Sequence, residues 1–165
     1  MVRYALTGTP GTGKTSISKQ LNKKILHLSD LYSEASEGKN STGEWLIDLE
    51  KLNGIVNKSN GSSLIIEGHL SHTLKNIEQI IVLRCDPNVL RLRLEKRAYS
   101  EVKIKENLEA EAIGIIYSEA LKLVDKTSLA LPLMIPVYIS NSPRIDEYFR
   151  IDCLIGLNSF LKKKL

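Results

Sequence analysis

The first fifteen residues contain the residue types that bind a phosphate group. Gly8, Gly13, Lys14 and Thr15 fit the spacing G-x-x-x-x-G-K-[ST] of a phosphate-binding loop, or P-loop. Glycines leave room for backbone N–H groups to curl around an anion, and the start of the next helix adds its unpaired N–H groups and its positive dipole end. Lys14 can reach the outer phosphates of a nucleotide, and the Thr15 hydroxyl can ligate a bridging Mg²⁺ ion. The loop is therefore predicted to bind a nucleotide together with Mg²⁺.

The residues on either side of this loop supply the strand and the helix that the motif requires. Tyr4–Leu6 is a short apolar run typical of a buried strand, and Ser16–Leu21 has the pattern of a helix. A chance glycine-rich turn would lack this context. We therefore expect the loop at the carboxyl end of the first strand, where the helix start can face the phosphates.

A carboxylate and an imidazole follow the buried strand predicted at residues 63–67. Glu67 ends this strand and His69 stands two residues later, so both side chains should point to the same side if the extended backbone continues through Gly68. We predict that Glu67 accepts hydrogen bonds from waters on Mg²⁺, and that His69 positions an attacking water or a neighbouring loop. The alternative for His69 is an ordinary hydrogen-bonded loop residue.

Two arginines end a helix that Asp86 and Pro87 should begin, with the acid as N-cap and the proline at the first helical position. Arg93 and Arg97 are four residues apart, so they share one face of this helix. A short turn follows, and residues 96–106 are predicted to form a lid. Cations on a lid can stabilise the charge of a phosphoryl group during its transfer. The alternative is a solvated helix face.

Strand and helix patterns alternate along the chain. Further strands are expected at residues 25–28, 80–84 and 135–139, a long helical segment at 101–131, and a C-terminal helix that begins at Ser142-Pro143 and ends at Lys162–Lys164. Such alternation is typical of a parallel sheet with its ligand at the carboxyl edge. The predicted fold class is α/β, a three-layer αβα P-loop NTPase fold with a five-stranded parallel sheet, in one domain over residues 1–165.

Residues 27–60 interrupt the alternation and are predicted to form a helical insertion that binds the phosphoryl acceptor. The expected elements are a helix capped by Ser29 or Asp30, a mobile polar loop at residues 37–43, and a second helix from Glu44 that buries Trp45, Leu49, Leu52 and Val56. The only tryptophan of the chain should thus report on the acceptor site.

Composition limits the classes of protein to which the chain can belong. The sequence has 165 residues, 42% hydrophobic and 25% charged, as in a soluble globular domain, and we expect no membrane partner. Cys85 and Cys153 are too few for a zinc or disulfide framework and should be buried thiols in a reducing, cytoplasmic setting. The net charge of +4 favours anionic partners without separating a nucleotide from RNA, and nothing points to DNA.

Two stretches of the chain resemble a known family. Leu6–Ser16 is similar to the P-loop of adenylate kinases, and Val82–Glu101, together with Ile66-Glu67-Gly68-His69, resembles the adenylate kinase isoenzyme 6 family. The resemblance continues through Asn107 to Glu111 and covers roughly three-quarters of the chain. It implies a small nucleoside monophosphate kinase with a short lid, which transfers a phosphoryl group from ATP to AMP or another monophosphate and also hydrolyses ATP.

The resemblance also implies residue roles and further partners. The ATP phosphates would be held by Gly11, Thr12, Gly13, Lys14, Thr15 and Ser16, and Arg97 would contact the nucleotide from the lid. A small-subunit ribosomal protein or rRNA is a further possible partner, because eukaryotic members assist maturation of that subunit. Two positions depart from the family pattern: Ala98 replaces a lid glycine, and Lys51 stands where an arginine on the monophosphate side is expected. Lysine lacks the bidentate fork of arginine, which puts the identity of the acceptor in question.

Other functions leave specific signatures in a sequence. The guanine motif of a GTPase, Asn-Lys-x-Asp, is matched only by Asn57–Asn60, which lacks the acid. A kinase of the shikimate type would have another polar loop in place of Glu67–His69. The main alternative is an ATPase switch, in which ATP binding controls contact with a ribosomal partner. Stimulation of turnover by AMP distinguishes the kinase from the switch.

Overall fold

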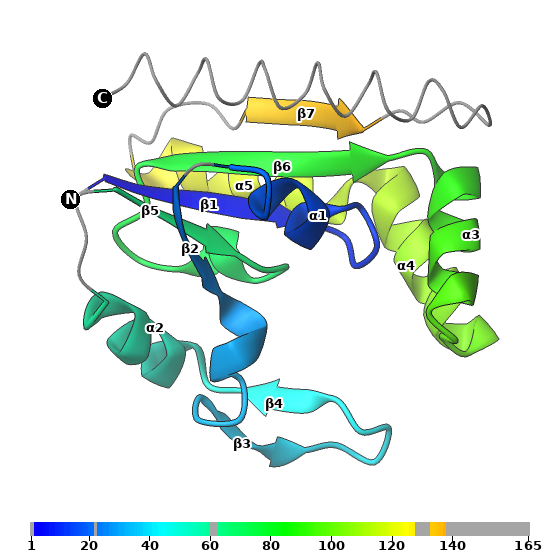
Figure 1. Ribbon diagram of the computed structural model, residues 1–165, viewed down its shortest axis with the longest axis horizontal. Coiled ribbons are helices and arrows are strands. Elements are labelled where there is room, and N and C mark those ends of the chain that lie inside the picture. The colour runs from blue at the N-terminus through cyan, green and yellow to red at the C-terminus, as the bar shows by residue number, and fades with distance from the viewer. Residues whose placement is uncertain (1, 22, 60–62, 128–132, 138–165) are drawn as a thin grey trace.

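The computed structural model describes residues 2–21, 23–59, 63–127 and 133–137. Its main sheet has five parallel strands in the order β2-β5-β1-β6-β7. The strands are β1 (Val2–Gly8), β2 (Lys24–His27), β5 (Ser63–Glu67), β6 (Gln79–Cys85) and β7 (Leu133–Val137). The P-loop follows the central strand β1 (Figure 1). The predicted α/β fold with a five-stranded parallel sheet is confirmed.

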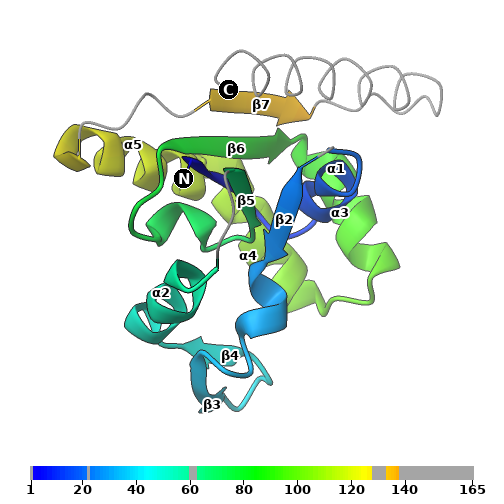
Figure 2. The ribbon, with the colours of Figure 1, turned by 60° about the vertical axis from the view of Figure 1, so that its left-hand side comes forward.

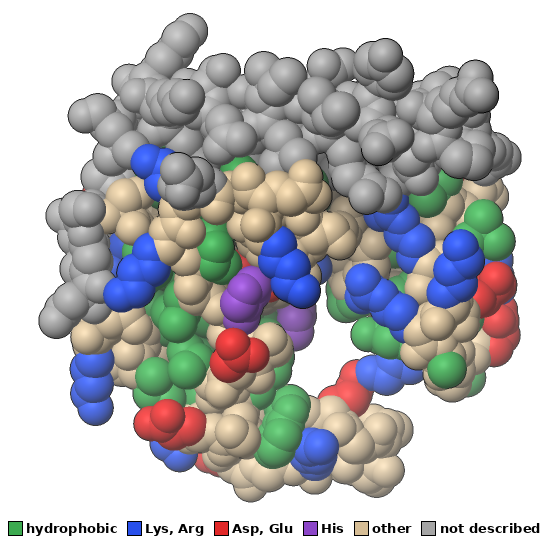
Figure 3. All heavy atoms as spheres, viewed as in Figure 1, with side chains coloured by type: hydrophobic (Ala, Val, Ile, Leu, Met, Phe, Trp, Pro, Cys, Tyr) green, Lys and Arg blue, Asp and Glu red, His purple; other side chains and the backbone are tan. Residues whose placement is uncertain are grey.

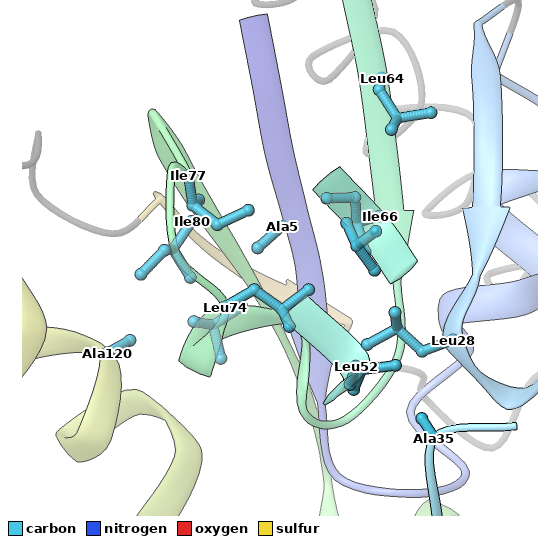
Figure 4. Close-up of a cluster of buried hydrophobic side chains, with 12 residues drawn as sticks. Ala5, Leu28, Ala35, Leu52, Leu64, Ile66, Leu74, Ile77, Ile80 and Ala120 are labelled. Atoms are coloured by element: carbon cyan, nitrogen blue, oxygen red, sulfur yellow. The ribbon is translucent and has the colours of Figure 1, made fainter. Parts of the chain in front are cut away.

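Alternate side chains of the strands face two different layers, as the period of a strand requires. Ala5, Ile66 and Ile80 are fully buried and face one layer, where they meet Leu52 and Ala120 (Figure 4). This layer contains α2 (Leu49–Asn57), the short 3-10 helix η2 (Ser71–Thr73) and α5 (Ile115–Thr127). The strands are buried on both sides because their neighbouring residues, such as Leu6 and Ile81, are also fully buried.

The P-loop leads into a short helix, α1 (Lys14–Ser18). The helix therefore begins and ends earlier than the predicted residues 16–21. Gly13 at its N-cap has a φ of 101°, which glycine adopts without strain. At Gly8, an added Cβ would lie 2.5 Å from the backbone oxygen of Leu83. The glycines of the motif are thus required by backbone conformation at one end and by close packing on β6 at the other.

The insertion between β2 and β5 differs from the sequence prediction. It contains the 3-10 helix η1 (Leu28–Leu31), an antiparallel hairpin of β3 (Ser36–Lys39) and β4 (Trp45–Ile47), and then α2. The predicted loop at 37–43 is wrong for residues 37–39, which belong to β3, and the helix predicted from Glu44 begins only at Leu49, so Trp45 lies on β4. Figure 2 shows the hairpin beyond η1 and α2, away from the main sheet.

The start of α2 explains this error. Asp48 accepts hydrogen bonds from the backbone N–H groups of Glu50 and Lys51, so the helix begins after the hairpin rather than within it. Leu52 and Val56 are buried as predicted, whereas Trp45 and Leu49 are 39% and 41% exposed. The helical spacing of Trp45 with the later residues is therefore coincidental. Neither Ser29 nor Asp30 caps an α-helix, since His27 precedes η1.

The helices after β6 follow the predicted caps more closely. Asp86 accepts from the N–H group of Asn88, and Pro87 opens α3 (Pro87–Lys96) as predicted. The expected helical segment at 101–131 is helical as far as residue 127, but Gly114, with a φ of 67°, divides it into α4 (Glu101–Ile113) and α5. Residues 128–131 lie outside the described part of the chain. The fifth strand lies two residues earlier than predicted, and Cys85 is buried. The predictions for Cys153 and for the helix that ends at Lys162–Lys164 lie outside the described residues.

The turn between α3 and α4 contains a strained residue, which leads to a stability prediction. Ala98 has a φ of 55°, in the left-handed region that disfavours any residue with a Cβ. Ala98→Gly should therefore raise the free energy of unfolding, by up to about 1 kcal/mol after the greater entropy of the unfolded glycine chain is subtracted. Urea denaturation measures the change, and Ala110→Gly within α4 is the control, which should lower stability. Equal losses in both variants would contradict strain at Ala98.

Candidate nucleotide-binding site

Two clefts flank the P-loop. The smaller one, of about 270 Å³, lies between the loop and α3, where Gly11, Gly13, Ser16, Arg93, Lys96 and Arg97 line it. The larger one, of about 920 Å³, is bounded by Lys14, Thr15, Glu67, His69, residues 44–47 of the hairpin and the first turns of α4. Figure 3 shows a hollow between the hairpin and α3 and α4. Every predicted site residue lines at least one of these two clefts, and Thr12, which lines the smaller one, is buried.

Lys14 is buried inside the P-loop. Its ammonium donates to the backbone oxygens of Gly8 and Thr9, at 2.7 and 3.0 Å. Burial lowers the pKa of Lys14 from 10.5 to about 8; the Glu67 carboxylate opposes this shift and the Arg97 guanidinium adds to it. The loop therefore holds a desolvated cation whose charge an incoming phosphate would stabilise.

This burial predicts the pH dependence of ATP use. Above pH 8 or so the free protein loses the Lys14 ammonium, and kcat/KM for ATP should fall about tenfold per pH unit. The corresponding fall in kcat, the descending limb of its pH profile, should occur at higher pH, because bound phosphates favour the charged form of Lys14. Stability should change in the opposite sense: the unfolded chain binds more protons between pH 8 and 10.5, so the contribution of Lys14 becomes more favourable as pH rises through that window. A kcat/KM profile that stays flat to pH 10 would contradict this assignment.

Glu67 lies beside the start of α1 at the end of β5. One of its carboxylate oxygens is 3.3 Å from the Thr15 hydroxyl, and the same oxygen is 2.6 Å from Nδ1 of His27. A hydroxyl and a carboxylate are the hard oxygen ligands that Mg²⁺ uses, and this ion completes its shell with waters and substrate phosphates. The pair of Thr15 and Glu67 therefore fits the predicted metal, as an inner ligand and as an acceptor for its waters.

His27 is a residue of this site that sequence reasoning missed. It lies opposite Glu67 in the parallel register of β2 and β5. The sequence places His27 at the end of an apolar run, but only the strand order shows that this run lies beside β5. Nδ1 of His27 contacts the same oxygen of the Glu67 carboxylate as the Thr15 hydroxyl does.

His69 faces the larger cleft with a neutral ring. Its Nδ1 is 3.3 Å from the hydroxyl of Tyr32, and the two rings meet edge to face. Burial lowers the pKa of His69 to about 4, and the charge of Lys14 adds to this effect. At neutral pH the imidazole can accept a hydrogen bond from a water or a substrate hydroxyl. Glu67 and His69 thus line the same cleft, although β5 ends at Glu67 and Gly68 is a bend rather than the extended residue on which the prediction depended.

The two arginines meet the P-loop from α3. Arg93 donates through Nη1 to the backbone oxygen of Gly11 at 3.2 Å. Arg97 ends α3 and borders both clefts. The two arginines therefore lie beside the P-loop, next to the short turn that leads to α4.

The far wall of the larger cleft is formed by the hairpin. Trp45, Leu46 and Ile47 line it, and an ion pair between Glu44 and Lys103 joins the hairpin to α4 across the opening. Lys51, the residue that replaces the expected arginine, is exposed on α2 and is not among the residues that line the cleft. Arg97 and Lys103 are positively charged residues that do line this cleft.

Within the described residues, no group of three or more His, Cys, Asp and Glu side chains is arranged to hold a metal ion. A two-residue Mg²⁺ site that relies on phosphates does not need such a group. Across the same part of the chain, none of the helices combines the length and apolar character required to cross a membrane.

The sequence of the chain matches a family of known proteins. Residues 5–114 match the AAA domain family. The chain is 43% identical over 139 residues to a protein of Methanosarcina acetivorans, which covers 73% of this chain and 72% of the relative. It is 39% identical over 131 residues to a protein of Methanocaldococcus jannaschii, with 72% of each chain covered. Both relatives are named "Putative adenylate kinase".

The chain belongs to the AAA domain family of P-loop proteins, and these archaeal proteins are among its relatives. The names of the archaeal relatives agree with the adenylate kinase part of the resemblance seen in the sequence, and they do not specify the isoenzyme 6 branch. Membership of the P-loop family implies nucleotide binding at residues 8–15.

Solved structures of low sequence identity share the fold of this family. Shikimate kinase from Bacteroides thetaiotaomicron superposes with a TM-score of 0.53 at 18% identity, over 98% of both chains. Shikimate kinase from Acinetobacter baumannii gives a TM-score of 0.52 at 14% identity, over 96% of this chain and 94% of that one. These likenesses support the α/β P-loop kinase fold.

Proposed function

We propose that the protein is a nucleoside monophosphate kinase that transfers the terminal phosphoryl group of ATP to AMP, with an accompanying ATPase activity. The observation that carries this proposal is the pair of clefts on either side of one P-loop, with Arg97 bordering both. A P-loop protein that only hydrolysed ATP would need room for a water, whereas the larger cleft has room for a second nucleotide. The names of the archaeal relatives support the same activity.

The proposed roles follow from the positions of the side chains. The P-loop backbone and Lys14 would hold the ATP phosphates, and Arg93 and Arg97 would stabilise charge on the group in transfer. Thr15 and Glu67 would hold Mg²⁺, which neutralises phosphate charge when bound. An oxygen of the acceptor phosphate attacks the terminal phosphorus of ATP as the bond to the ADP oxygen breaks, so ATP and AMP yield two ADP.

A coupled assay of ATP against AMP, CMP, UMP and GMP tests the proposal, with the ATPase rate without acceptor measured beside it. We expect AMP to raise ADP formation well above the rate without acceptor, because a bound acceptor replaces water as the nucleophile. ADP formation that no monophosphate increases would contradict the kinase activity.

Trp45 provides a test of the acceptor side. It is the only tryptophan in the chain and lines the larger cleft from β4, where Lys39 stacks on its ring. AMP, or a bisubstrate adenosine polyphosphate, should change its fluorescence more than ATP alone does. Trp45→Phe is the control, in which the signal must vanish while transfer activity remains. A flat signal with AMP in the active wild-type protein would place the acceptor elsewhere.

The second candidate function is an ATPase switch that acts with a small-subunit ribosomal protein or rRNA. The neutral imidazole of His69 in the larger cleft favours it, because such a ring can orient a water toward the phosphates. His69→Ala should then lower hydrolysis without acceptor more than transfer to AMP, and we expect about a tenfold difference between the two losses. Equal losses would mean that His69 only supports the loop. A rate of ATP turnover that does not change with added AMP but rises when the ribosomal partner is added would favour the switch.

A further inference from the structure

A buried carboxylate on α4 connects the lid side of the molecule to the P-loop. Glu111 is 2% exposed and both of its carboxylate oxygens accept hydrogen bonds. Oε1 accepts from Nε of Arg84 and from the backbone N–H group of Cys85, each at 2.8 Å. Oε2 accepts from the hydroxyl of Thr9 at 2.5 Å. The two oxygens therefore have separate tasks: one holds the end of β6, and the other holds the P-loop.

Thr9 transmits this contact to the centre of the loop. Its side chain is 3% exposed, and its backbone oxygen accepts from the Lys14 ammonium at 3.0 Å. The same oxygen accepts from the N–H group and the hydroxyl of Thr12, at 3.2 and 2.9 Å. The hydroxyl of Thr9 is thus fixed by α4 while its carbonyl fixes Lys14. A rotation of Thr9 would displace the oxygen that orients the ammonium.

We propose that Glu111 is a positioning residue, which acts through the Thr9 hydroxyl to set the shape of the P-loop and the place of Lys14. The inference rests on the proposed use of this loop as the ATP site. Three residues separate Arg97 from Glu101, where α4 begins, so the helix that follows the lid turn also holds the phosphate loop. The buried hydrogen bond from Thr9 to Glu111 is therefore one link between this helix and the phosphate loop.

A purely structural role would use the other oxygen of Glu111. Its contacts with Arg84 and Cys85 tie α4 to β6, and an unpaired buried carboxylate there would destabilise the protein. The contacts of Glu111 with the P-loop and with β6 can be removed separately. Thr9 takes part only in the contact with the P-loop, here called the P-loop arm, and Arg84 only in the contact with β6, here called the β6 arm.

Thr9→Val and Thr9→Ser form the matched pair for the test. Valine keeps the shape of threonine and removes the donor, whereas serine keeps the donor. Thr9→Val should lower kcat by about tenfold or more, since a misplaced ammonium no longer meets the charge that develops in transfer. In the protein without nucleotide, amide hydrogen exchange should become faster at residues 9–13. Thr9→Ser should remain within about twofold of wild type in both measurements.

A pH profile separates positioning from a general loss of stability. Once its carbonyl cradle is disturbed, Lys14 should become more hydrated, so the descending limb of kcat/KM near pH 8 should move to higher pH in Thr9→Val. Arg84→Met is the control for the β6 arm. It should lower the urea midpoint and leave the position of the limb unchanged. Thr9→Ala removes the same donor without added bulk and carries the test if Thr9→Val does not fold.

The proposal is overturned if Thr9→Val and Thr9→Ser have the same kcat, the same pH limb and the same exchange at residues 9–13. It is also overturned if Thr9→Val changes only the urea midpoint. The assays on the wild-type protein judge the proposed function separately. A wild type that transfers nothing to AMP would contradict the kinase, while hydrogen exchange in the protein without nucleotide would still decide whether Glu111 holds the loop.

Discussion

Turnover of Lys14→Ala is expected to fall by about a hundredfold or more, because the variant lacks the cation that stabilises phosphoryl charge in the transition state. The fold should persist. Lys14 is desolvated in the free protein and its partners are two loop carbonyls at the cleft, to which water gains access once the side chain is removed. The measurements are kcat in the ATP and AMP assay and the urea midpoint. Lys19→Ala, an exposed lysine at the end of α1, is the matched control.

A Lys14→Ala protein whose turnover stays within about threefold of wild type would contradict the assignment of the P-loop as the catalytic phosphate site. If Lys19→Ala lost as much turnover as Lys14→Ala, the effect would reflect the general charge of the surface rather than one placed ammonium. The pH limb near 8 should also be absent from Lys14→Ala, since this residue is the group assigned to it.

Glu67→Gln should weaken both transfer to AMP and ATP hydrolysis, by about tenfold to a hundredfold, and high Mg²⁺ should restore part of each rate. One oxygen of the Glu67 carboxylate contacts both the Thr15 hydroxyl and the His27 ring. Glutamine keeps the size of the glutamate side chain and removes its negative charge. Kinetics at several Mg²⁺ concentrations measure the effect. Glu37→Gln on the exposed β3 is the control with the same chemical change.

The dependence on Mg²⁺ is the decisive part of this experiment. A Glu67→Gln protein with an unchanged apparent affinity for Mg²⁺ and a lower urea midpoint would show that the carboxylate serves β2 and β5 alone. A loss confined to transfer would place Glu67 with the acceptor rather than with the metal.

The parts of the fold that the sequence predicts well are those with local causes. β5 has the predicted bounds, Ser63–Glu67, because a β-branched apolar run between glycines has few other conformations. α3 begins where Asp86 and Pro87 indicate, since a cap acts within three residues. The P-loop likewise depends on glycines whose spacing is fixed within eight residues.

The parts that it does not predict depend on distant partners or on competing signals. The hairpin from Ser36 to Ile47 was not predicted because Trp45 has helical spacing to Leu52. Only the cap at Asp48 shows that the helix begins after Trp45 and that Trp45 belongs to a strand. His27 lies beside Glu67 because β2 pairs with β5, and this pairing is not visible in the local sequence. Glu111 acts on a residue 102 positions away, and no local pattern marks such a contact.

The order of the strands also determines when the phosphate loop can take its shape during folding. β1 lies between β5 and β6, whereas β2, the next strand in the chain, lies at the far side of β5. Leu6 pairs with Glu67 on one side and with Ile81 on the other, so two long loops must close before the loop has support. Contacts between such distant residues form slowly. A nascent chain that ends before β6 therefore has no complete nucleotide site, and ATP can stabilise this protein only after the centre of its sheet has formed.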